Sequence, residues 1–149
     1  MSLFDTVNTD IKEAMRAKEK VKLEALRAIK SAFLLAKTEK GSGELTPEAE
    51  LKIIQKLVKQ RKDSAQTYKE NNRMELYEKE MVEAEVIEQY LPKQMSEEEI
   101  KNEVIAVIKQ VGAEGPQDMG KVMGVITKKL AGKADNKVVS QIVKQTLVN

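Results

Sequence analysis

Apolar residues recur every three to four positions along most of this chain, and this spacing places them on one side of an α-helix. In the first such stretch, Phe4, Val7 and Ile11 share one face of a helix predicted over residues 3–18. Later stretches repeat the pattern between segments that contain glycine, proline or asparagine, which interrupt helices. The pattern predicts seven helices, over residues 3–18, 23–39, 47–70, 73–90, 97–111, 119–131 and 136–147.

Several predicted helix ends carry residues that cap helices. Ser96 followed by Glu99 matches a capping box, in which each side chain bonds the backbone N–H of the other residue. Asp118 and Asp135 are expected to cap the sixth and seventh helices through their carboxylates. Gly132 is expected to end the sixth helix in the left-handed conformation that glycine adopts without strain.

Pro92 divides the chain. A proline disfavours the helical conformation of the residue before it, so the fourth helix should end just before Leu91. Each helix after this point has a single apolar stripe, and three such helices bury their stripes by packing together. We therefore predict an all-α protein with an N-terminal four-helix domain, residues 1–91, and a C-terminal three-helix bundle, residues 92–149.

The composition excludes several kinds of chemistry. The chain has no cysteine and no histidine, which excludes disulfides, thiol nucleophiles, imidazole bases and the usual zinc sites. It also shows no recognisable nucleophile–base pair and no nucleotide-binding loop. We therefore expect no catalytic residue, no metal, no cofactor and no enzymatic activity of the chain on its own.

Acidic residues crowd one side of the fourth predicted helix. Clustered carboxylates can bind Mg²⁺ or act as an acid–base pair. Because no other catalytic group accompanies them, we interpret them as a solvated helix face. These residues are Glu75, Glu78, Glu80, Glu83, Glu85 and Glu88.

The first residues, MSLFDTVNTDIKEAM, lack the basic start and the apolar run of a secretory signal. No apolar run in the sequence approaches the roughly 18 residues that a membrane-spanning helix needs. We therefore expect a cytoplasmic protein with no membrane association.

Two glycines, Gly120 and Gly124, lie four positions apart within the sixth predicted helix. Glycine inside a helix is about 1 kcal/mol less favourable than alanine. Close packing against another helix would offset this loss, and so would close approach of a ligand backbone. The sequence leaves both explanations open.

Lysines surround these glycines and the turn at Gly132. Residues 116–149 contain six lysines against two aspartates, which suggests an anionic partner. Free backbone N–H groups at the start of the seventh helix would add an anion site. These groups would bind phosphates without reading base sequence, although a solubilising surface is an equal alternative. The lysines expected to contact phosphates are Lys121, Lys128, Lys129, Lys133 and Lys137.

The same segment carries an ordered series of motifs: DMGKVMG at 118–124, then Lys128, then GKAD at 132–135, then Val138-Val139 and Val143-Lys144. Together with LRAIKSA at 26–32 and EQYLP at 88–92, this series resembles the YqeY-like family over the whole chain. The last third is also similar to the tail domain of GatB, the B subunit of the glutamine-dependent amidotransferase that converts Glu-tRNA(Gln) or Asp-tRNA(Asn).

The resemblance implies an all-helical protein whose three-helix tail contacts tRNA. Our leading hypothesis is a tRNA-binding or tRNA-associated module without catalysis of its own. A second hypothesis is an accessory subunit of an amidotransferase or an aminoacyl-tRNA synthetase that acts through protein contacts. A remote alternative is a carbon–nitrogen ligase that uses glutamine as amido donor within a complex, although the catalytic parts of the amidotransferase have no counterpart in this chain.

Overall fold

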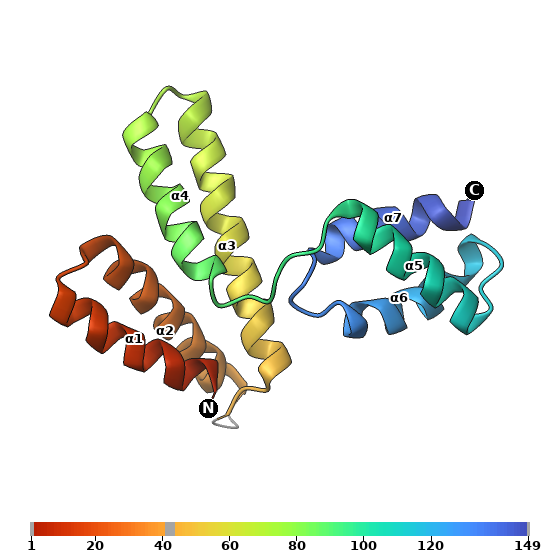
Figure 1. Ribbon diagram of the computed structural model, residues 1–149, viewed down its shortest axis with the longest axis horizontal. Coiled ribbons are helices and arrows are strands. Elements are labelled where there is room, and N and C mark those ends of the chain that lie inside the picture. The colour runs from red at the N-terminus through yellow and green to blue at the C-terminus, as the bar shows by residue number, and fades with distance from the viewer. Residues whose placement is uncertain (1, 41–43, 149) are drawn as a thin grey trace. The chain divides into compact units, whose positions relative to one another are not determined.

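The computed structural model of the protein describes residues 2–40 and 44–148, and every regular element in these ranges is helical (Figure 1). The all-α fold class predicted from the apolar spacing is confirmed. A short 3-10 helix, η1, precedes the sixth α-helix. The elements are α1 Leu3–Ala17, α2 Lys20–Lys40, α3 Pro47–Glu70, α4 Met74–Glu88, α5 Glu97–Val111, η1 Pro116–Asp118, α6 Met119–Lys129 and α7 Asn136–Val148.

The chain divides into two compact units, residues 1–91 and residues 92–149. Unit 1 contains α1 to α4, and unit 2 contains α5 to α7 with η1. Each unit has an apolar core of its own. Both phenylalanines and all three tyrosines belong to unit 1, so the core of unit 2 is entirely aliphatic.

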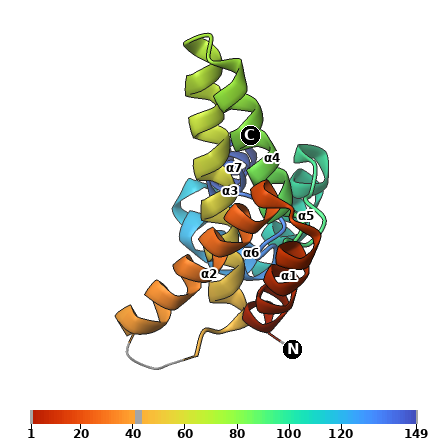
Figure 2. The same cartoon turned by 90° about the vertical axis from the view of Figure 1, so that its left-hand side faces the viewer.

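Unit 1 consists of two helical hairpins, α1–α2 and α3–α4, with α2 packed against both α3 and α4. The far end of the α3–α4 hairpin extends beyond α1 and α2 (Figures 1 and 2). The largest fully buried side chains of the core are Phe33, Leu26, Ile29, Ile54 and Ile87. The core therefore lies where the two hairpins meet, and the far end of α3–α4 has less cover.

Two hydrogen bonds attach α1 to the other hairpin. The backbone N–H of Phe4 in the first turn of α1 donates to Glu50 Oε2 of α3 at 3.0 Å. Glu50 is only 2% exposed, so a buried carboxylate from a distant helix caps α1. The Tyr90 hydroxyl, two residues beyond the end of α4, donates to the carboxylate of Asp10 in α1. Burial and this hydrogen bond raise the pKa of the Tyr90 phenol above its usual range.

Unit 2 is a bundle of three helices that each contact the other two. The predicted capping box at Ser96 and Glu99 is present at the start of α5. Glu99 is exposed, and its hydrogen bonds to the Ser96 backbone and side chain lower the pKa of its carboxyl. The core side chains come from every helix and from Ala134 in the last connection.

The structure corrects one predicted cap. Asp118 precedes α6 but makes no side-chain cap there. Its Oδ2 instead accepts a hydrogen bond from the backbone N–H of Glu114 at 2.9 Å, which closes the loop before η1. The sequence pattern missed this arrangement because the extra turn of 3-10 helix at 116–118 changes which N–H groups the carboxylate can reach.

Replacing Glu50 with alanine should lower the free energy of unfolding of unit 1 by about 1–2 kcal/mol, because a buried helix N–H loses its acceptor. Tyrosine fluorescence in urea measures this unit selectively, because all the tyrosines lie in it. Exposed Glu48 of the same helix turn provides the matched control, Glu48→Ala. Equal losses for the two variants would contradict a capping role for Glu50.

The raised pKa of Tyr90 makes a prediction for alkaline pH. Above about pH 10 the unfolded chain loses the phenolic proton while the folded chain keeps it, so the folded state binds more protons and stability falls as pH rises. In Tyr90→Phe this part of the decline should disappear. Urea unfolding at pH 8 to 11, followed by far-ultraviolet circular dichroism, measures the difference between the two proteins, and parallel curves would refute it.

Candidate nucleic-acid interface

One side of α6 carries two glycines and two lysines that are all exposed. Because a helix turns once every 3.6 residues, Gly120, Lys121, Gly124 and Lys128 lie on one face, opposite the buried Val122 and Ile126. We call these first four residues the glycine–lysine face. It presents bare helix backbone to solvent between two flexible cations.

The space around the two glycines decides between the explanations that the sequence left open. A Cβ atom built on Gly120 or Gly124 would meet no atom within 4 Å. Neither residue has a positive φ, so the backbone conformation does not require glycine either. Close packing within this chain therefore does not account for them, and close approach of a ligand is the explanation that stays a prediction.

Gly132 has a different role, which its backbone conformation explains. It follows α6 with a φ of 76°, in the left-handed region where a side chain would be strained. Its carbonyl accepts from Gln94 Nε2 at 2.8 Å, and the carbonyl of Lys133 accepts from the Met95 N–H at 2.9 Å. The segment before α5 therefore holds the α6–α7 turn, while the Lys133 side chain stays exposed.

The start of α7 differs from the predicted anion site. Asp135 caps the helix as expected, because its Oδ1 accepts the Lys137 N–H at 2.9 Å. The chain's own carboxylate thus occupies one of the N–H groups that the prediction assigned to a ligand. The Asp135 carboxylate would repel a phosphate bound beside it. Phosphate binding at this turn would therefore depend on the exposed lysine side chains and not on the N-terminus of α7.

One of the predicted lysines has an ion-pair partner within the protein. Lys129 points toward α5, where its Nζ lies 2.8 Å from Glu103 Oε2. That ion pair compensates its charge and helps to fix α6 on α5. Within the described residues, Lys121, Lys128, Lys133 and Lys137 are exposed and have no ion pair.

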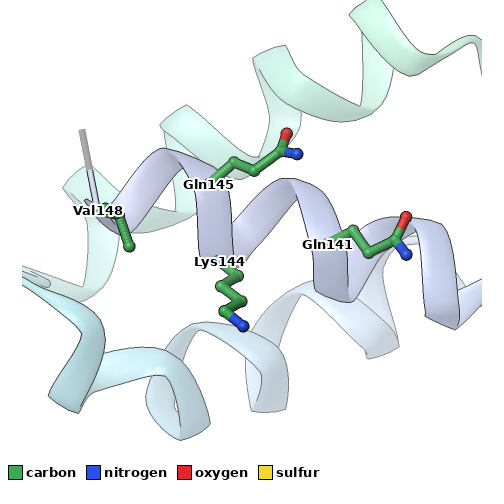
Figure 3. Close-up of a pocket in the computed structure, with 4 residues that line it drawn as sticks. All are labelled: Gln141, Lys144, Gln145 and Val148. Atoms are coloured by element: carbon green, nitrogen blue, oxygen red, sulfur yellow. The ribbon is translucent and has the colours of Figure 1, made fainter.

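Lys144 of α7 was not among the candidate residues, and the structure adds it to the surface near α6. Figure 3 shows its side chain extending from α7 toward α6, whereas Gln145 extends to the opposite side. Lys137 lies two helical turns earlier on the same exposed stripe. The seven-residue spacing of these lysines was visible in the sequence, but the side of α7 that faces α6 was not.

Figure 3 also shows the shallow surface beside Lys144, which is lined by residues of α7 only: Gln141, Lys144, Gln145 and Val148. The two glutamine amides and the Lys144 ammonium can donate hydrogen bonds to an acceptor, and none of the four side chains is a nucleophile paired with a base. Among the described residues, no group of three or more histidine, cysteine, aspartate or glutamate side chains is arranged to hold a metal ion. Within the same residues, no helix has the length and apolarity to span a membrane.

Comparison with known proteins gives one family match and several relatives. The model of a family described as Yqey-like protein matches residues 4–147. A relative in Clavispora lusitaniae, "Altered inheritance of mitochondria protein 41, mitochondrial", is 32% identical over 132 residues, covering 87% of this chain and 74% of that protein. The protein of the same name in Pyrenophora tritici-repentis is 30% identical over 146 residues, covering 95% and 78%.

A third relative of the same name, in Candida glabrata, is 31% identical over 137 residues, covering 90% of this chain and 71% of that protein. All three of these relatives are named as mitochondrial proteins, which contradicts the expected cytoplasmic location. The prediction of a cytoplasmic location is therefore wrong. It rested on the absence of a secretory signal and of a membrane span, and neither absence specifies a compartment. Neither the family description nor these names states a catalytic activity.

Replacing Gly124 with alanine should raise the free energy of unfolding of unit 2 by about 0.5–1 kcal/mol, because the new methyl group enters open space and favours the helix. Gly132→Ala is the matched control, and it should destabilise by about 1 kcal/mol because of the positive φ. Amide hydrogen exchange in α5 to α7 measures both changes. A loss of stability in Gly124→Ala would show that the glycine serves packing after all.

Proposed function

The chain belongs to the Yqey-like protein family, and from this premise we propose that it is a non-catalytic tRNA-binding module. In this proposal the glycine–lysine face of α6, with Lys133, Lys137 and Lys144 beside it, contacts the phosphate backbone. The resemblance of the GKAD segment to the tail of GatB supports tRNA as the nucleic acid. The exposed glycines with no neighbour to pack against are the observation that carries the proposal.

The physical argument begins with the glycines. Glycine has no side chain, so a sugar–phosphate strand can approach the helix backbone more closely at a glycine than at any other residue. Lys121 lies beside the two glycines and Lys128 lies one turn beyond Gly124, and each can reach a phosphate oxygen. Neutralising phosphates releases condensed counterions, which drives binding and makes the affinity depend strongly on salt.

The aliphatic composition of unit 2 limits the ways in which it could contact a nucleic acid. Binding of single strands without sequence preference usually relies on aromatic side chains that stack on bases. Unit 2 contains no aromatic residue. The proposal is therefore that the module recognises the backbone of a folded RNA and leaves its bases unread, which agrees with lysine contacts that position a protein without specifying sequence.

The candidate residues divide into three roles in this proposal. Lys121 and Lys128 contact phosphates from α6, and Lys133, Lys137 and Lys144 do so from the turn and from α7. Gly132 permits the reversal that brings the two helices together, and Lys129 fixes α6 through Glu103. No residue has a catalytic role.

The paired variant Lys121→Glu, Lys128→Glu should weaken binding of total tRNA at least tenfold at about 100 mM salt and lower the salt slope by roughly two. Fluorescence anisotropy with labelled tRNA across a salt series measures both quantities. Lys101→Glu, Lys109→Glu on α5 makes the same charge change on another helix and is the matched control. Both lysines of the control are exposed, and its affinity should fall only by the small amount that a change in net charge causes.

A third variant tests the glycines without changing any charge. Gly124→Leu places a bulky side chain on the glycine–lysine face, where the structure has room for it. It should reduce tRNA affinity while the protein stays folded by circular dichroism. Unchanged affinity in Gly124→Leu would remove the role of close approach, and no tRNA binding by the wild-type chain at low salt would overturn the proposal.

A further inference from the structure

The side of α4 that faces away from the core of unit 1 combines apolar and acidic side chains at helical spacing. Met74 and Met81 lie seven residues apart, and Glu78, Glu85 and Glu88 fall on the same side of the helix. Met74 is 47% exposed, although it begins a helix whose other side is buried. Exposed apolar residues grouped in this way, rather than scattered singly, mark interaction surfaces.

A groove lies between α3 and α4 on this side of α4, and apolar side chains form part of its lining. Its floor includes buried Ala84 and half-buried Met81, and Val82 at its edge is 46% exposed. The two helices form the hairpin whose far end extends beyond α1 and α2 (Figures 1 and 2). The lining residues are Lys62, Met81, Val82, Ala84, Glu85 and Glu88.

Acidic side chains outnumber basic ones in the lining of the groove, where Glu85 and Glu88 accompany Lys62. Helix α4 carries six glutamates and one lysine, and that lysine, Lys79, pairs with Glu24 of α2 at 3.3 Å. Glu88 pairs with Lys62 of α3 at 3.4 Å across the groove. The other two glutamates of this side, at 78 and 85, are exposed and have no ion pair within the described residues. Uncompensated negative charge therefore borders the apolar floor.

We propose that the α3–α4 groove binds a basic amphipathic helix of another protein. An apolar residue once per heptad would rest on Met74 and Met81, whose flexible side chains adapt to different partners. Lysine or arginine side chains beside those residues would meet Glu78 and Glu85, and this complementarity would steer the encounter and fix the register. The same carboxylates repel phosphates, so this surface is unsuited to RNA.

This partner site is independent of the proposed RNA contact. It lies in unit 1, it has the opposite charge, and it shares no residue with the glycine–lysine face. Interpreting the glutamates of α4 as a solvated face explains their charge, but it leaves exposed Met74 and Val82 and half-buried Met81 without a role. A helix docked on the groove would remove these apolar side chains from water.

The test uses the full chain and a fluorescein-labelled synthetic helix as long as α4, with one leucine per heptad on one face and lysines beside the leucines. The peptide should bind the wild-type chain, and the same peptide with glutamate at each lysine position should not. The variant Glu78→Lys, Glu85→Lys should bind the lysine peptide at least tenfold more weakly while its tRNA affinity does not fall. Met74→Ser should also weaken peptide binding severalfold.

The exposed pair Glu13→Lys, Glu44→Lys makes the same change in net charge away from α4 and should lower peptide affinity by much less. If the double lysine variant unfolds by circular dichroism, the neutral pair Glu78→Gln, Glu85→Gln replaces it, with the same direction of effect. Equal binding of both peptides, or equal losses in the α4 variant and its control, would overturn the proposal. A concentration-dependent dimer that Met74→Ser abolishes would assign the groove to a second copy and would also overturn it.

Discussion

The left-handed turn at Gly132 determines which side chains of unit 2 share a surface. It reverses the chain between α6 and α7 within a few residues, and the next buried side chain, Ala134, already belongs to the core. Gln94 and Met95 hold the carbonyls of the turn from the segment that begins α5. Because two hydrogen bonds hold the middle of the turn, the lysines of α7 and the bare side of α6 have a defined relation to each other.

Unit 2 tolerates an unfavourable feature at that surface. Glycine within α6 weakens the helix by about 1 kcal/mol, and no contact inside the chain compensates for it locally. Compensation comes from the aliphatic core on the opposite side of α6, where Val122 and Ile126 are fully buried. A helix anchored in this way can keep an exposed face free of side chains, which is a property suited to contact with another backbone.

The chain as a whole has a formal net charge of only +2, yet one segment in each unit carries a clear excess of one charge, and the two excesses are opposite in sign. Six lysines and two aspartates occupy residues 116–149, whereas α4 carries six glutamates and one lysine. Near neutrality of the whole chain therefore conceals one surface suited to anions and another suited to cations. The pairing of Lys62 with Glu88 and of Lys79 with Glu24 leaves the acidic excess on one side of the α3–α4 hairpin.

The sequence by itself determined the helices, because apolar spacing, the Ser96–Glu99 capping box and the positive φ required at Gly132 are local properties. It also identified four of the five exposed lysines of the proposed interface, all except Lys144. It could not show that Asp118 bonds Glu114, that Lys129 pairs with Glu103, or that Lys144 points toward α6. Each of these depends on which groups from other parts of the fold lie within a few ångströms. Only tertiary structure decided them, because distances between residues far apart in sequence are set by packing rather than by local pattern.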